Sequence, residues 1–198
     1  MGSEMCIRDR GRMALLSRHA LAAALVLQAT LVRAQTEPPA PTSPTEFEVK
    51  AAFLYNFARF VEWPAETGHD ATPFVIAILG RDPFGAVLDD TVAGKTVGGR
   101  PIEVRRVARA DEARDAQIVF VSPSERPNTA AILKALERPG ILTVGDTDGF
   151  ASQGGAINFT LQARRVRFEI NPTAAEQARL KMSSQLLKLA TLVPGPRP

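Results

Sequence analysis

Two carboxylates in the segment GDTDG, residues 145–149, are the side chains of this sequence best placed to do chemistry. Asp146 and Asp148 follow an apolar run that predicts a buried strand. Ligands of open α/β sheets bind at the carboxyl ends of such strands, and two carboxylates there could hold a hard cation. Aspartate and glycine are also ordinary turn residues, and no further oxygen ligands are evident nearby. The sequence therefore favours a turn, and we predict no metal site.

The segment LGRDPFG, residues 79–85, has the same position after another apolar run. Gly80 lets the chain turn sharply, and Phe84 could insert beneath the loop. A structural turn is the simpler interpretation, and a small-ligand pocket is the alternative. The residues that would line that pocket are Asp82, Phe84, Gly85, Asp146 and Asp148.

Other patterns that carry chemistry are incomplete. TVAGKT resembles the end of a phosphate-binding loop, but Asp89 stands where the loop needs its first glycine. His69 is the only histidine after residue 34, and neither Ser122 nor Ser124 lies in a nucleophile-elbow pattern. No cysteine follows Cys6, which argues further against a transition-metal site. We expect no enzymatic activity and no cofactor.

Alternating strand and helix patterns predict the fold. Strands are expected at 74–80, 102–107, 117–122 and 141–146, helices at 82–92 and 124–140, and a hairpin from 156–162 and 165–171. A last helix is expected from about Pro172 to Leu192, capped by Asn171 or by a capping box of Thr173 and Glu176. The predicted class is α/β: a single domain with a mostly parallel central sheet of about six strands, a C-terminal antiparallel hairpin and helices on both faces.

An aromatic helix opens this domain within residues 46–63, and Pro64 is expected to end it. Phenylalanines recur at i, i+4 and i+7 on one face, and apolar residues cover more than half of the circumference. A buried core helix is the simpler interpretation. The alternative is that part of the aromatic surface docks a partner, because Tyr55 and Trp63 lie on the polar side.

The N-terminal residues predict export. We interpret residues 1–12 as an artefactual leader and residues 13–34 as a signal peptide that is cut after Ala34. A membrane anchor is the alternative, but an apolar run of about twelve residues is too short to span a bilayer. Residues 35–45 form a proline-rich linker, residues 46–192 the domain, and residues 193–198 a disordered tail.

Charge argues against a nucleic-acid partner. After residue 34 the chain has 19 basic and 19 acidic residues, so the formal net charge is zero. Binding to phosphate backbones needs a surplus of positive charge, which this segment lacks.

Six blocks, in this order and spacing, resemble the YfiR family: VKAAFLYNFARFVEWP, ILGRDPFG, GRPIEV, ILTVGDTDGFASQGGAINF, RVRFEIN and RLKMSSQLLKLA. The resemblance covers roughly residues 46–192. It implies a periplasmic repressor that contacts the periplasmic sensor region of an inner-membrane diguanylate cyclase and lowers cyclic-di-GMP signalling. It also implies that an outer-membrane lipoprotein can sequester the repressor.

The resemblance further implies a homodimer, which must be noncovalent here. Better-known members carry disulfides that link redox state to stability, and this chain has no cysteine after Cys6. A periplasmic small-ligand sensor is the alternative function. The residues expected to bind a partner are Tyr55, Phe57, Arg59, Phe60, Trp63, Leu180, Met182 and Leu186.

Overall fold

The computed structural model describes residues 44–65 and 72–195 of the chain. The predictions for residues 1–43, namely the leader, the signal peptide and nearly all of the linker, lie outside the described residues, as does His69. Within the described ranges, no helix is both long and apolar enough to cross a membrane.

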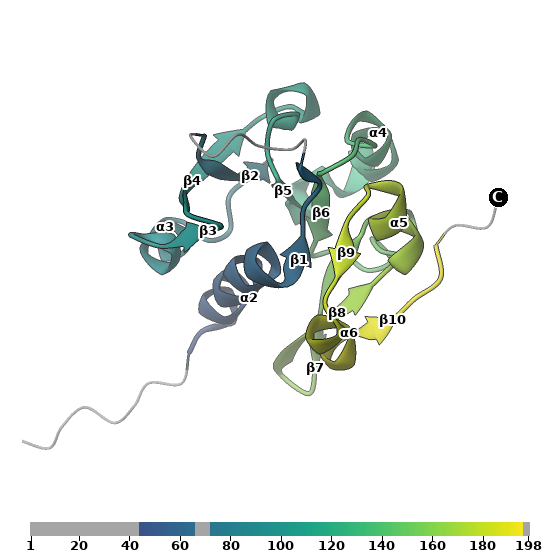
Figure 1. Cartoon of the computed structure of the whole chain (residues 1–198). Coiled ribbons are helices and arrows are strands. Elements are labelled where there is room, and N and C mark those ends of the chain that lie inside the picture. Colours follow the sequence, from purple (N-terminus) through teal and green to yellow (C-terminus); the bar gives the residue numbers. More distant parts are fainter. Residues whose placement is uncertain (1–43, 66–71, 196–198) are drawn as a thin grey trace, which may run out of the picture. The chain divides into compact units, whose positions relative to one another are not determined.

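An eight-stranded sheet forms the centre of the domain, in the order β10-β8-β7-β6-β5-β2-β4-β3 (Figure 1). Neighbouring strands are parallel except for the pairs β7–β8 and β3–β4. The predicted fold class is confirmed, with short strands β3 and β10 added at the two edges. The strands of this sheet are β2 (Phe74–Leu79), β3 (Thr96–Val97), β4 (Arg100–Val107), β5 (Ile118–Val121), β6 (Leu142–Gly145), β7 (Ile157–Gln162), β8 (Arg165–Ile170) and β10 (Thr191–Leu192).

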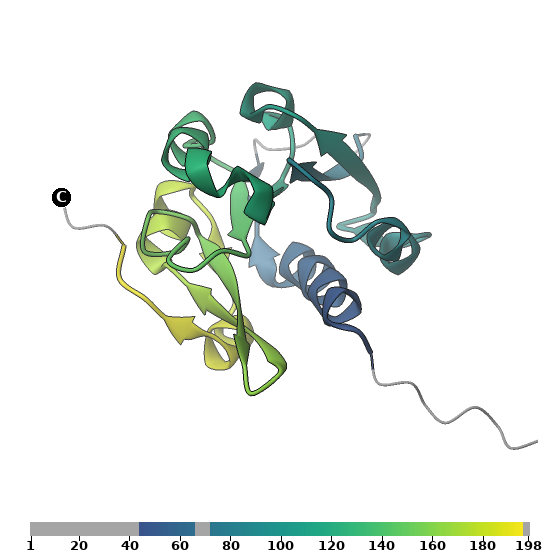
Figure 2. The same ribbon diagram turned by 180° about the vertical axis from the view of Figure 1, so that it is seen from behind.

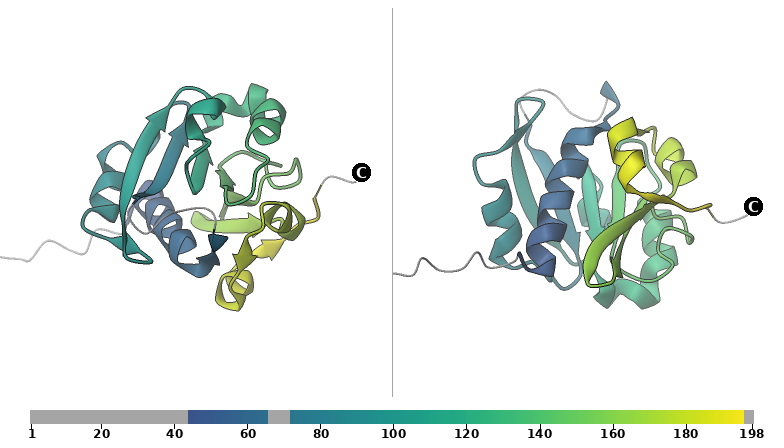
Figure 3. Two further views of the ribbon diagram at one scale, coloured as in Figure 1. Left: turned by 45° about the horizontal axis from the view of Figure 1, so that its top comes forward. Right: turned by 90° about the horizontal axis from the view of Figure 1, so that it is seen from below.

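Helices cover both faces of the sheet because the central strands are apolar on both sides. All six side chains of β2 are buried, and they alternate between two separate cores. One core lies under α2 and α3, and the other lies under η2 and α4 (Figures 2 and 3). The helices are α2 (Glu46–Phe60), α3 (Ala86–Val92), η2 (Ala110–Ala113), η3 (Pro123–Asn128), α4 (Thr129–Ala135), α5 (Pro172–Gln177) and α6 (Ser184–Leu189).

A capping box begins helix α2, and the helix ends earlier than predicted. The Thr45 hydroxyl accepts a hydrogen bond from the Glu48 N–H, and the Glu48 carboxylate accepts one from the Thr45 N–H. The helix ends at Phe60, so the prediction that Pro64 ends it is wrong. The next two residues form β1 (Val61–Glu62), which pairs antiparallel with β9 (Lys181–Met182). A strand partner far along the chain therefore ends this helix.

The last helix is not continuous, which corrects the prediction for residues 172–192. The Asn171 side chain caps α5 by accepting a hydrogen bond from the Ala174 N–H at 3.1 Å, as one predicted alternative had it. After Gln177 the chain turns through Arg179, whose φ of 55° lies in the left-handed region. Strand β9, helix α6 and strand β10 follow. The turn carries no glycine, so the usual stop signal was absent.

Candidate partner-binding surface

The structure brings the two predicted partner-binding segments together. Val61 lies opposite Met182 in the β1–β9 pair, and the Ser183 N–H donates a hydrogen bond to the Phe60 carbonyl at 3.1 Å. The end of α2 is thereby fixed against the segment that precedes α6 (Figure 1). This contact was not predicted, because each segment was identified from its own residues alone.

Three of the eight predicted partner-binding residues belong to the core, which corrects their expected place on the surface. Phe57 is fully buried, and Leu180 and Leu186 are each 3% exposed. The Phe57 ring stacks on Phe159 at 5.7 Å and meets Phe168 edge-on at 5.2 Å. Their apolar side chains gain more from burial than from contact with water.

The other five residues are at least partly accessible. Arg59 is exposed, and its guanidinium lies 5.7 Å from the centres of both the Tyr55 and the Phe60 rings. Trp63 is half-buried, and its indole N–H donates to the Ala58 carbonyl at 3.1 Å. Met182 is half-buried against the core. Their role in binding a partner stays a prediction.

A groove that was not predicted from the sequence runs along the flank of α2. It has a volume of about 250 Å³, and it includes Val49, Ala52 and Phe53 among its lining residues. Glu48 and Asn56 add the polar part of the lining. Ala52 is exposed, and Val49 and Phe53 are half-buried. Apolar residues cover more than half of the circumference of α2, and on this flank some of them stay accessible.

The β7–β8 hairpin continues this apolar surface. Strand β6 pairs with β7 only at Ile157 and Asn158, so the rest of β7 extends past it. Leu161 lies opposite Val166 and is 52% exposed. It points to the same side of the strand as Phe159, whose ring is 6.2 Å from that of Phe53. We call the residues Val49, Ala52, Phe53, Leu161 and Val166 the α2–hairpin surface.

Positive charge borders the α2–hairpin surface. Arg164, Arg165 and Arg167 are exposed at the turn and on the other face of the hairpin. Within the part of the chain that the structure describes, these three side chains form no ion pair. The surface thus combines apolar side chains with guanidinium groups that are available to a partner.

A buried lysine fixes α2 to the carboxyl end of β6. Lys50 is 1% exposed, and its Nζ donates to an Asp146 carboxylate oxygen at 2.7 Å and also to Glu46. Nζ lies 5.3 Å from the centre of the Phe47 ring and 5.9 Å from that of Phe159. Burial raises the pKa of Asp146 above its ordinary value of 3.8, and the hydrogen bond from Lys50 opposes this rise.

Asp146 was predicted as a candidate site residue, whereas its partner Lys50 was not. At 100° per residue, Lys50 falls in the same arc of α2 as the buried Leu54 and Phe57. A charged residue within an apolar arc is rarely buried without a partner. The position of Lys50 within the apolar arc therefore indicated that it needs an acidic partner elsewhere in the chain.

The predicted ligand-pocket residues are held by contacts within the chain. The Asp82 carboxylate accepts hydrogen bonds from the Phe84 N–H at 2.7 Å and from Arg106 at 2.9 Å. Phe84 is 3% exposed and does insert beneath its loop, and the Gly85 carbonyl accepts a hydrogen bond from Arg106 at 2.9 Å. Asp148 is exposed.

The loops that follow β2 and β5, where ligands of open α/β sheets bind, are joined to each other. The Ser122 hydroxyl donates to the Arg81 carbonyl at 2.6 Å, and the Arg81 N–H donates to the Ser124 hydroxyl at 3.0 Å. Neither Asp82 nor Asp146 lines any of four cavities that described residues form. The described ranges also contain no group of three His, Cys, Asp or Glu side chains that could hold a metal ion. The ligand pocket stays a prediction.

Comparison with known proteins relates the chain to one family. A protein-family model described as YfiR/HmsC-like matches residues 47–191. A conserved domain protein from Vibrio cholerae O1 biovar El Tor has a similar solved structure, with 13% identity over 75% of this chain and 60% of that chain and a TM-score of 0.49. An ABC domain from Streptococcus pneumonia, solved in complex with L-Trp, has 12% identity over 60% of this chain and 55% of that chain and a TM-score of 0.40. The chain thus spans less than two thirds of both solved chains, and no curated protein matches it.

Proposed function

Because this chain belongs to the YfiR/HmsC-like family, we propose that it represses an inner-membrane diguanylate cyclase by contacting the periplasmic sensor region of that enzyme. The family supports, in general, a periplasmic regulator of cyclic-di-GMP signalling that acts through protein–protein contacts. In this proposal the chain carries out no chemistry, and its binding lowers the output of the cyclase.

The α2–hairpin surface is the observation that carries this proposal. Ala52 and Leu161 expose apolar area next to a groove, and Arg164, Arg165 and Arg167 flank it without acidic partners in the described ranges. Interfaces are centred on apolar side chains and are enriched in arginine. The unpaired guanidinium groups favour a partner surface with carboxylates, which would also speed the encounter.

The same surface offers a basis for the other proposed partners. An outer-membrane lipoprotein that covered the α2–hairpin surface would displace the cyclase and so release it. A second copy of this chain would do the same through noncovalent contacts. Both partners therefore compete with the cyclase in this proposal.

Capture of the partner tests the proposal. The tagged full chain is incubated with solubilised native membranes, and mass spectrometry identifies what it retains. We expect a membrane diguanylate cyclase with a periplasmic domain. Ala52→Glu and Leu161→Glu, which each place a charge on the apolar surface, should reduce its recovery at least about tenfold.

A matched variant controls for the added charge. Ala131→Glu makes the same change at an exposed position of α4, on the other face of the sheet, and should retain the cyclase. Thermal unfolding should be unchanged in all three variants. Arg59→Glu tests the residues at the end of α2 separately. Recovery of no cyclase, or equal recovery with all variants, would contradict the proposal.

A further inference from the structure

A hollow of about 500 Å³ lies at the side of the sheet where the parallel strands begin, away from the α2–hairpin surface. Its walls come from the segments that lead into β2, β5 and β6 and from β4. Val75 and Ile141 are among its apolar lining residues, together with Pro73 and Pro139. This volume falls in the range of small-molecule sites.

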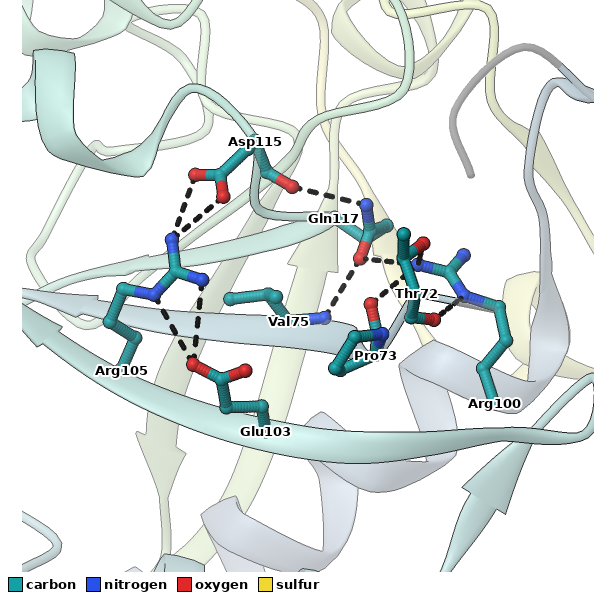
Figure 4. Close-up of polar contacts among 8 residues, drawn as sticks. All are labelled: Thr72, Pro73, Val75, Arg100, Glu103, Arg105, Asp115 and Gln117. Atoms are coloured by element: carbon teal, nitrogen blue, oxygen red, sulfur yellow. Dashed lines mark hydrogen bonds and ion pairs between the residues drawn. The ribbon is translucent and has the colours of Figure 1, made fainter. Parts of the chain in front are cut away.

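Positive charge exceeds negative charge in this hollow. Four arginines and two acidic residues line it, and one arginine takes both acids. Arg105 binds the Asp115 carboxylate through two hydrogen bonds of 2.8 and 2.9 Å, and it contacts Glu103 at 3.4 Å (Figure 4). The remaining three arginines have no carboxylate partner among the described residues.

Among the described residues, Arg100 is held in place by neutral acceptors alone. Its Nε donates to the Thr72 carbonyl at 2.7 Å, and its Nη2 donates to the Pro73 carbonyl at 2.6 Å and to the Gln117 side-chain oxygen at 3.3 Å (Figure 4). Gln117 is 5% exposed and is itself fixed, because its side-chain oxygen accepts from the Val75 N–H at 2.8 Å. The positive charge of this guanidinium is thus oriented but not neutralised by the described residues, and its Nη1 has no hydrogen-bond partner among them.

Arg114 and Arg138 add two further guanidinium groups. Both side chains are exposed on the wall of the hollow, and neither forms a hydrogen bond or ion pair with any residue of the described ranges. Guanidinium forks match the geometry of carboxylate and phosphate groups. A ligand with such a group would neutralise charge that the described residues leave uncompensated.

We propose that this hollow binds a small organic anion, with its phosphate or carboxylate group on Arg100, Arg114 and Arg138 and its carbon body on Val75 and Ile141. The apolar part of the lining distinguishes an organic anion from a bare inorganic ion, because burial of carbon against it adds to the affinity. This site is separate from the predicted pocket at Asp82 and Asp146. It goes beyond the proposed repressor function by giving the protein a second, small-molecule input.

Titration of the full chain with three probes tests this site. Phenyl phosphate and isophthalate carry a phosphate and two carboxylates on the same apolar ring, and inorganic phosphate has no carbon body. Isothermal calorimetry at physiological salt should show saturable binding of at least one ring-bearing probe with a Kd of about 1 mM or tighter. If both phenyl phosphate and isophthalate bind, the one with the lower Kd identifies the preferred anionic group. Inorganic phosphate should bind more weakly than any ring-bearing probe that binds.

Trp63, the only tryptophan, gives an independent signal. Its ring lies edge-on to Phe74 at 5.1 Å, and the guanidinium of Arg100 lies 5.6 Å from the centre of the same Phe74 ring. Occupation of the hollow should therefore change the tryptophan fluorescence with the same midpoint as the heat of binding.

Substitutions in the wall of the hollow test whether the probes bind there. Arg114→Gln and Arg138→Gln remove side chains that have no hydrogen bond or ion pair to lose within the described ranges, and each should weaken binding about tenfold. Arg126→Gln, a matched change at an exposed arginine of η3 outside the hollow, should have no effect. Absence of saturable binding by both ring-bearing probes, affinity unaffected by either hollow substitution, or equal affinity for inorganic phosphate would each overturn the proposal.

Discussion

Replacement of Lys50 by methionine is the sharpest test of how α2 is held on the sheet. Methionine keeps an unbranched apolar side chain of similar length and removes the charge, so the change isolates the ammonium group. It breaks the 2.7 Å contact with Asp146, the contact with Glu46, and the approach to the Phe47 and Phe159 rings.

The expected loss in the free energy of unfolding depends on how well the carboxylates of Asp146 and Glu46 are hydrated once Lys50 is removed. Removing one partner of a fully buried ion pair costs about 3–5 kcal/mol, because the other charge stays buried without compensation. The Asp146 side chain is 17% exposed, whereas Glu46 is 39% exposed and can be hydrated. The cost should therefore lie near the lower end, at about 3 kcal/mol. For a domain of this size, that corresponds to a loss of roughly 6–12 °C in Tm.

The loss of stability caused by Lys50→Met should depend on pH in a definite direction. Burial already raises the pKa of Asp146, and loss of Lys50 removes an interaction that lowers it. A carboxyl group whose pKa is raised by folding binds more protons in the folded state, so stability falls as pH rises through that pKa. The variant should lose more stability than the wild type on this rise. The penalty should therefore be largest near neutral pH and smaller at about pH 5.

Urea unfolding at pH 7.5 and pH 5, followed by circular dichroism, measures this penalty. Lys50→Met combined with Asp146→Asn should be more stable than Lys50→Met alone, because it removes the uncompensated charge. Lys134→Met, at an exposed position of α4, is the matched control and should change stability by less than about 0.5 kcal/mol. A cost below about 0.5 kcal/mol for Lys50→Met at pH 7.5, or a cost that grows on acidification, would refute the reasoning.

Three further predictions concern stability. Gly155→Ala would place a methyl group 2.1 Å from the buried ring of Phe150, so the free energy of unfolding should fall by more than about 2 kcal/mol, and an unchanged denaturation midpoint would show that the ring moves freely. Ala163 and Arg164 form the hairpin turn with φ values of 48° and 63°, which asparagine and glycine tolerate better. Replacing them with Asn-Gly should therefore raise the free energy of unfolding by about 1 kcal/mol. An unchanged denaturation midpoint would show that the turn relaxes in solution. An arginine hydrogen bond lowers the pKa of Asp89, so this carboxylate stabilises the folded state above its ordinary pKa of 3.8 and loses that effect as pH falls. Asp89→Asn should cost up to about 1 kcal/mol at pH 7 and progressively less as the pH falls below 3.8, and a difference that does not shrink on acidification would contradict an ionic origin.

Sequence patterns predicted the local and strongly apolar elements of this fold. The runs that form β2, β5 and β6 are buried on both faces, and the hairpin alternates with a period of two, so each has a direct signature in its residues. The cap at Asn171 was also readable, because an asparagine precedes a proline at the start of α5.

Contacts between distant segments were not readable in the same way. The β1–β9 pair joins two strands of two residues each, too short to show any period, and it changed the ends of two predicted helices. The partner of Lys50 lies 96 residues away at Asp146. The arginines of the hollow come from β4 and two loops, so only the folded chain shows that they share a wall.

A line of contacts joins the proposed anion site to the end of α2. The Arg100 guanidinium lies over Phe74, the Phe74 ring packs against Trp63, and the Trp63 indole donates to the Ala58 carbonyl in the last turns of the helix. An anion that binds Nη1 of Arg100, which has no hydrogen-bond partner among the described residues, changes the first contact of this line. If both proposals hold, anion and cyclase binding should be coupled.

Thermodynamic linkage makes this coupling measurable from either side. The factor by which a saturating anion changes the affinity for the cyclase sensor region must equal the factor by which that region changes the affinity for the anion. We expect a factor of about five or more for phenyl phosphate or isophthalate, whichever binds. Phe74→Leu interrupts the line of contacts, and it should bring the factor close to one while each ligand still binds alone. Equal affinity for the sensor region with and without the anion would show that the two sites act independently, since a ligand that makes no differential contact cannot shift the other equilibrium.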